Sequence, residues 1–213
     1  MKTRQRLIGL RDWLQATVCD GRKMKAPPNS MDTLDFTYQD PKVYIGFAPQ
    51  RPNPFDPSGD RVSVAPSIIV MPNPAKQAYI EEKRWDRFDK IRRNKEMGQH
   101  FNVTMLCTVY EPGVRDASFA LEDNIDVKHI DEGTEQGIFT LSDWMDDIRD
   151  RLLSQQFIPN TDLFLDAESL IEAFYTDENY IVDKRPLYYG YVACDFGCFA
   201  ERHEQNPIDD FLR

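Results

Sequence analysis

The sequence has few of the residues and motifs that mark common catalytic sites. Only three histidines and four cysteines occur among its 213 residues. No histidine stands in an H-E-x-x-H pattern, and the chain has no G-x-S-x-G nucleophile elbow and no glycine-rich phosphate loop. These absences exclude the common signatures of zinc proteases, α/β-hydrolases and kinases, so Asp195-Phe196-Gly197 is no kinase motif.

Positive charge and long apolar runs are also scarce. The chain has 26 basic and 36 acidic residues, a net charge of −10. Binding to nucleic acid or to an anionic membrane needs an excess of lysine and arginine, so neither is expected. No run approaches the roughly 18 apolar residues of a membrane span. Charges interrupt the N-terminal apolar residues, so we expect no signal peptide.

The cysteines suggest a metal site only at first sight. They are Cys19, Cys107, Cys194 and Cys198. With His203, the last two could supply three ligands. If residues 187–198 form one strand, however, these two thiols lie about 13 Å apart, too far for one metal or a disulfide. We therefore expect reduced, packed thiols and no cofactor.

Hydrophobic periodicity predicts two helices. Residues 4–18 carry apolar side chains at helical spacing and end near Gly21. Residues 141–154 do the same, and Thr140 with Asp143 has capping-box spacing. The aspartates at 143, 146 and 147 suit a helix start and a solvated face.

The segment between these helices holds a long proline-rich excursion. Residues 27–74 contain ten of the fourteen prolines, which prevents a helix and a central strand over much of this range. We expect short strands near Lys42–Phe47 and Val62–Met71, with Pro66 near an edge or a bulge. Such a long excursion is typical of a functional or interaction loop.

Alternating side chains predict two long strands. In residues 99–111, five odd-numbered positions are apolar and face one way: Phe101, Val103, Met105, Cys107 and Val109. Residues 187–198 alternate similarly, with Tyr188, Val192, Cys194, Phe196 and Cys198 on one face. Residues 163–175 suit either a helix or a strand paired with the final one, and residues 199–213 read as a loose tail.

These elements predict a single α+β domain over residues 1–213, with a mostly antiparallel sheet and two or three helices. Its insertions are the proline-rich excursion and an acidic loop at about 111–140, in which residues 114–139 lack periodicity. Residues 75–98 could be a helix or an extended arm.

Charge is unevenly distributed along the chain. Residues 76–95 hold eight basic and four acidic residues, a net of +4, and residues 111–150 hold three basic and twelve acidic, a net of −9. Two oppositely charged segments on one chain suit a head-to-tail contact between copies, and such contacts can close into a ring. The candidate interface residues are Trp85, Arg87, Arg92, Arg93, Asp126, Asp131 and Glu132. Base stacking by Trp85 and Phe88, or a merely amphipathic edge, are alternatives.

An enzyme remains a further alternative. His100 or His129 could combine with scattered carboxylates in a metal-dependent hydrolase. Glu122, Asp123 and Asp126 lack the glycine spacing of a calcium-binding hand.

Five stretches together suggest a family. They are "LIGLRDWL", "VAPSIIVMP", "FNVTMLCTVYEP", "LSDWMDDIRDRLLS" and "PLYYGYVACDFGC", in this order. The order, and above all the P-x-Y-Y-G-Y strand with the helix before it, resembles the tail terminator proteins of long-tailed bacteriophages and related contractile particles.

The resemblance implies an α+β fold that assembles as a homo-oligomeric, typically hexameric ring on the tail tube. Such a ring stops tube polymerisation and contacts a head-completion or neck protein. It implies a virion protein assembled in the host bacterial cytoplasm, no enzyme and no cofactor. An acidic ring wall would let DNA pass without binding it. A neck or head–tail adaptor protein is the alternative.

Overall fold

The computed structural model describes the protein over most of its length. The described residues are 1–27, 36–52, 61–73, 98–111, 127–174, 176–177, 180–181 and 186–199. The segment 75–98, except its last residue, and the tail beyond Phe199 lie outside them, so the predictions made there stay predictions.

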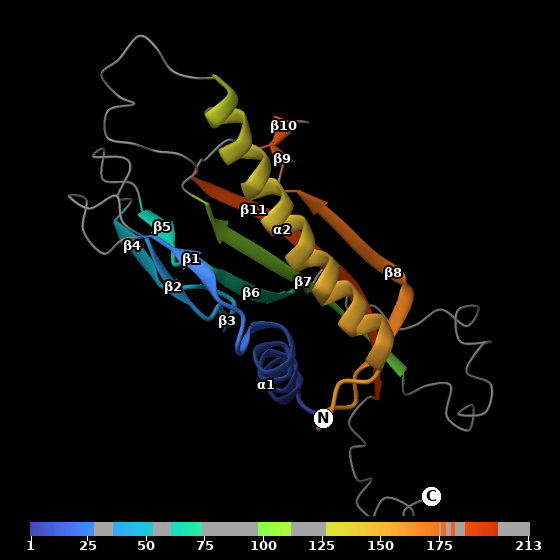
Figure 1. Ribbon diagram of the computed structural model, residues 1–213. Coiled ribbons are helices and arrows are strands. Elements are labelled where there is room, and N and C mark those ends of the chain that lie inside the picture. The colour runs from blue at the N-terminus through green and yellow to red at the C-terminus, as the bar shows by residue number, and fades with distance from the viewer. Residues whose placement is uncertain are drawn as a thin grey trace, which may run out of the picture.

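A five-stranded sheet forms the centre of the fold, in the order β3-β6-β7-β11-β8 (Figure 1). Its strands are β3 (Lys42–Ile45), β6 (Ser67–Pro72), β7 (Gly98–Tyr110), β11 (Leu187–Phe199) and β8 (Phe164–Phe174). Only β3 and β6 run parallel, and every other pair of neighbours is antiparallel. The predicted α+β class with a mostly antiparallel sheet is therefore confirmed.

Two helical segments cover one face of this sheet. Helix α1 (Thr3–Leu14) continues into a π-helical turn, η1 (Gln15–Cys19), and α2 spans Val127–Gln155. Both pack into the same core cluster, and Figure 1 shows both on the same side of the sheet. The four apolar residues of the predicted first helix are all buried: Leu7, Leu10, Leu14 and Val18. Gly21, with φ of +82°, follows directly after the helical region.

The core follows from the alternation in β7 and β11. All five predicted β7 residues are buried, with at most 2% of each side chain exposed. Because Met105 pairs with Val192 and Val103 with Cys194, the apolar faces of both strands lie under the helices. Burial of these side chains contributes about 1.5–3 kcal/mol each, which makes this face the main stabilising layer.

Helix α2 is longer than the sequence predicts. It begins at Val127, so the expected acidic loop is wrong over residues 127–139. Thr140 consequently lies inside the helix, where its hydroxyl accepts a hydrogen bond from Gln136 (3.1 Å), and the predicted capping box does not form. The aspartates at 143 and 147 do lie on an exposed face, as expected, although they stand far from the helix start.

The proline-rich excursion contains more short strands than predicted. Two antiparallel ribbons form in addition: β1 (Met24–Ala26) with β2 (Thr37–Gln39), and β4 (Gln50–Pro52) with β5 (Arg61–Ser63). The expected strand Val62–Met71 is divided, because β5 ends at Ser63 and β6 begins at Ser67. Pro66 stands between them, where its missing amide hydrogen breaks the ladder.

The ambiguous segment 163–175 forms a strand, β8, paired with β11. The register between the two strands shifts between Ala193 and Asp195, so this pair carries a bulge in its middle. A small antiparallel pair, β9 (Thr176–Asp177) and β10 (Tyr180–Ile181), follows it.

Candidate interaction surfaces

The C-terminal thiols are packing residues. Cys194 and Cys198 are buried in β11 on the core side, and both are free, as are the other two cysteines. Burial raises the pKa of the Cys198 thiol to about 11 and that of Cys19 to about 12. A buried thiol whose pKa is raised in this way carries little thiolate at neutral pH, which agrees with a packing role. Within the described ranges, no three His, Cys, Asp or Glu side chains converge as a metal site.

Two of the three histidines lie in elements that the structure describes. His100 is half-buried in β7, opposite Gly197 of β11. His129 lies in the first turn of α2, and His203 falls outside the described residues.

The tyrosine–glycine motif of β11 shapes the contact with α2. A Cβ atom at Gly190 would come within 2.6 Å of the Met145 sulfur, so a larger residue here would require the Met145 side chain to move. About two turns before Met145, a Cβ at Gly137 would lie 2.2 Å from the Tyr188 ring. The motif therefore has an architectural role, since it sets the position of α2 on the sheet.

The predicted interface residues are only partly located. Asp131 and Glu132 lie in the first turns of α2, and not in a loop as expected. The other five, Trp85, Arg87, Arg92, Arg93 and Asp126, lie outside the described residues, so their pairing stays a prediction.

The β1–β2 ribbon and the residues around β3 carry exposed aromatic rings and basic residues. We name residues 20–27 and 36–52 the aromatic edge. The Phe36 and Tyr38 rings meet edge to face, 5.6 Å between centroids, and the Lys25 ammonium lies 5.0 Å from the Phe36 centroid. Tyr38 is 60% exposed and Phe47 is 89% exposed. This edge has five basic and two acidic residues, a net charge of +3.

Ion pairs fix the aromatic edge to the rest of the fold. Lys25 pairs with Glu111, which is buried at the end of β7, and Arg22 pairs with Asp147 of α2. Lys23 pairs with Asp40 within the edge, 2.8 Å, and this bond lowers the pKa of the half-buried Asp40 carboxyl. The β1–β2 ribbon is thus held in place while its rings stay accessible.

The terminal strand β8 and the end of α2 before it are acidic. We name residues 146–174, which include the last turns of α2 and strand β8, the acidic edge. It has seven acidic and two basic residues, a net charge of −5. Arg149 contacts three carboxylates, those of Asp146 (2.6 Å), Asp150 (3.0 Å) and Glu172 (3.3 Å). Burial nonetheless raises the pKa of Glu172, and the nearby aspartates act in the same direction.

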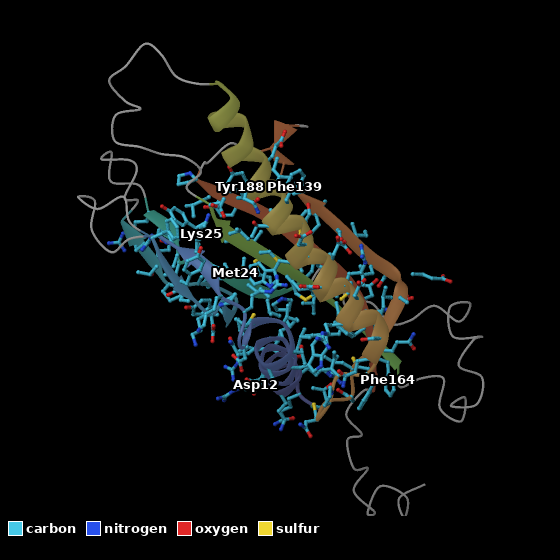
Figure 2. The ribbon with its side chains drawn as sticks, in the orientation of Figure 1. Asp12, Met24, Lys25, Phe139, Phe164 and Tyr188 are labelled. Carbon is cyan, nitrogen blue, oxygen red and sulfur yellow. The ribbon has the colours of Figure 1, made fainter. Side chains whose placement is uncertain are left out.

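Apolar side chains are also exposed on the acidic edge. Ile171 of β8 is 56% exposed, and Leu153 and Phe157 are also exposed. In Figure 2, Lys25 and Phe164 lie well apart, whereas the pair of Arg22 with Asp147 joins the aromatic edge to the acidic edge at α2. The sequence did not reveal either region, because each brings together segments that are distant in the chain.

No protein-family model matches the chain, and no curated protein or solved structure is significantly similar to it. Among the described residues, no helix is both long and apolar enough to cross a membrane.

Proposed function

We propose that this chain is a structural subunit of a virion, a tail terminator that forms a ring of about six copies on the tail tube. The observation that carries the proposal is the presence of two exposed apolar groups, one on and beside the β1–β2 ribbon (Phe36, Tyr38, Phe47) and one on and before β8 (Leu153, Phe157, Ile171). Two separate surfaces of this kind on one subunit suit repeated contact between copies. The order of helix, strands, long helix and final strand is also the order on which the family resemblance rests.

A ring subunit of this kind needs no catalytic step. Its task is to bind the last tube ring on one side and a head-completion or neck protein on the other. With a net charge of −10, the ring wall repels the phosphates of passing DNA. Assembly takes place in the host bacterial cytoplasm, and the finished ring stays in the virion between tail and head.

Assembly on tubes tests the proposal. The purified chain is mixed with a polymerising phage tail tube protein, and tube length and end structure are followed by cryo-electron microscopy. We expect tubes that stop growing and carry a ring at one end, with rings also visible by mass photometry. A chain that stays monomeric and leaves tube growth unchanged would refute the proposal. Binding to the portal side alone would favour a neck or adaptor protein.

Charge reversal tests the segment interface predicted from the sequence. Arg92→Glu with Arg93→Glu should weaken ring formation, because the contact with the acidic segment around Asp131 becomes repulsive. The same change in net charge at Lys2→Glu with Arg4→Glu, at the exposed start of α1, serves as the control. Equal ring formation by both variants would remove this interface from the proposal.

A further inference from the structure

An exposed apolar group lies between the end of α2 and the start of β8. Leu153 and Phe157, on either side of the end of α2, are 39% and 40% exposed. The Phe157 ring lies 4.9 Å from the half-buried Phe164 ring at the start of β8, centroid to centroid (Figure 2 labels Phe164). We name Leu153, Phe157 and Phe164 the β8-start group.

Backbone contacts hold this group in place. Phe157 and Phe164 form an isolated antiparallel bridge, and the Leu165 amide donates a hydrogen bond to the Gln156 carbonyl (2.7 Å). The two rings are therefore presented at a fixed position and do not depend on a partner for it. Apolar side chains exposed in this way are typical of a contact surface.

The final strand of the chain ends beside this group. In the register of β11 with β8, Gly197 lies opposite Phe164, and β11 ends two residues later at Phe199. Two residues along the strand and one strand spacing place Phe199 about 8 Å from the start of β8. Residues 200–213, which we name the final segment, follow Phe199 and lie outside the described residues.

The sequence of the final segment suits the β8-start group. Its large apolar residues are Ile208, Phe211 and Leu212, with two aspartates between them. Beside the group, Arg151 on the last turns of α2 is exposed and makes no ion pair with another described residue. Apolar side chains and an aspartate pair in the final segment thus match an apolar group with a basic neighbour.

We infer that the final segment docks on the β8-start group of its own copy and covers it until the ring assembles. The inference rests on the proposed function, because it adds regulation to one of the surfaces through which copies meet. Contact between copies at Leu153 and Phe157 then has to displace the segment. Assembly is favoured where binding to the tail tube supplies the free energy for this displacement.

Reach selects the same copy as the source of the docked segment. Ile208 is nine residues beyond Phe199, so it can lie at most about 30 Å away from it. The β8-start group of its own copy is well within this distance. The equivalent group of a neighbour in a ring lies about one subunit diameter away, roughly 40–45 Å for a chain of this length. A segment tethered so closely has an effective concentration in the millimolar range, so even a weak apolar contact forms.

Cross-linking within one copy tests the docking. The variant with both Ser154→Cys and Asn206→Cys is treated with a short bismaleimide at a concentration at which the chain is monomeric. Ser154 is exposed and lies between Leu153 and Phe157 in the sequence. The four native thiols are buried, so the new thiols react preferentially. We expect a cross-link within one copy, identified by peptide mass spectrometry of the monomer band.

Two variants control this experiment. Tyr38→Cys with Asn206→Cys should give no cross-link within one copy, although Tyr38 is 60% exposed. Tyr38 pairs in register with Lys25, which lies well apart from Phe164 (Figure 2). Phe211→Asp added to the first cysteine pair should abolish its cross-link, because a charged side chain cannot enter the apolar group without a large cost. Circular dichroism checks that each variant folds.

Ring formation tests the regulatory role. Phe211→Asp in the otherwise native chain should form rings at an about tenfold lower concentration in mass photometry, which corresponds to about 1.4 kcal/mol. Gln205→Asp adds the same charge to the final segment away from its apolar residues and should leave this concentration unchanged. Equal or weaker ring formation by Phe211→Asp than by the wild type would refute the regulatory role.

The outcomes separate the inference from the function itself. If the chain caps tubes but the cysteine pair gives no cross-link, or only one between copies, the docking is wrong and the proposed function stands. If the cross-link forms within one copy but the chain forms no rings under any condition, the docking stands, and its role in assembly fails together with the proposed function.

Discussion

The close contact between α1 and the turn after α2 gives a sharp prediction. A Cβ atom at Gly9 would lie 2.3 Å from the Thr161 methyl carbon. Thr161 cannot rotate this methyl away, because its hydroxyl donates to the Ile158 carbonyl (2.7 Å) and accepts from the Leu163 amide (3.1 Å). Gly9→Ala should therefore strain the packing of α1.

Two opposing effects set the magnitude. Alanine in a helix interior gains about 1 kcal/mol over glycine. Overpacking of a buried contact costs about 1–3 kcal/mol. Gly9→Ala should thus be neutral to destabilising by about 2 kcal/mol, despite the better helix former. Thr161→Ser removes the methyl and keeps both hydrogen bonds, and in this background the next neighbour of the new Cβ is the Thr161 Cβ position, at 3.8 Å.

The double variant is the decisive measurement. Gly9→Ala with Thr161→Ser should be more stable than Gly9→Ala alone, because the clash worth about 1–3 kcal/mol is gone, less about 0.8 kcal/mol for the buried methyl that serine lacks. Urea denaturation followed by circular dichroism gives the four free energies of a double-mutant cycle. Simple additivity of the two substitutions, or a Gly9→Ala protein more stable than the wild type, would refute the reasoning.

Three further predictions concern single contacts. Arg6 is buried and donates two hydrogen bonds to the Asp162 carboxylate, of 2.9 and 2.8 Å. Burial raises the pKa of this carboxyl, but the hydrogen bonds and charge of the Arg6 guanidinium lower it by more, so the pKa in the folded protein lies below its ordinary value. The pair's stabilisation is therefore complete above the unfolded pKa of about 4 and is lost as pH falls through the lower folded value. Asp162→Asn should lower the free energy of unfolding by about 3 kcal/mol at pH 7 and make that free energy depend less on pH in the acidic range. An unchanged free energy of unfolding would contradict this. Gly137→Ala should destabilise the protein by about 1–3 kcal/mol in thermal unfolding, because the new methyl meets the Tyr188 ring. In a Tyr188→Ala background, Gly137→Ala should no longer destabilise the protein. If it still does, the Tyr188 ring is not the cause. The native thiols should not react with maleimide at neutral pH until the protein unfolds, and rapid labelling of the folded chain would show that burial does not protect them.

The strands and the first helix were predictable because each buries one face. Period-two alternation in β7 and β11, and the spacing of Leu7 and Leu10, report directly on that face. Their burial confirms those predictions. The separation of Cys194 and Cys198 along one strand follows from the same alternation, so the sequence pattern by itself argues against a metal site at these two thiols.

Other features had no such local signal. Residues 127–136 of α2 extend beyond the sheet-covering part of the helix, so the sequence shows no apolar periodicity there and resembles a loop. Residues 163–175 suited two structures, and the choice of strand depends on pairing with β11, which is distant in sequence. The two edges were equally hidden, since an edge exists only once the strand order is known.

The net charge bears directly on the proposed assembly. A chain of net charge −10 repels its own copies at long range, so the proposed ring needs contacts that outweigh this repulsion. The basic residues around β1 offer little free charge for this, because Arg22, Lys23 and Lys25 pair within the chain with Asp147, Asp40 and Glu111. Burial of apolar side chains therefore has to supply most of the affinity of any contact between copies at these residues. Salt screens the repulsion between copies, so raising the salt concentration should not weaken a ring held mainly by apolar contacts.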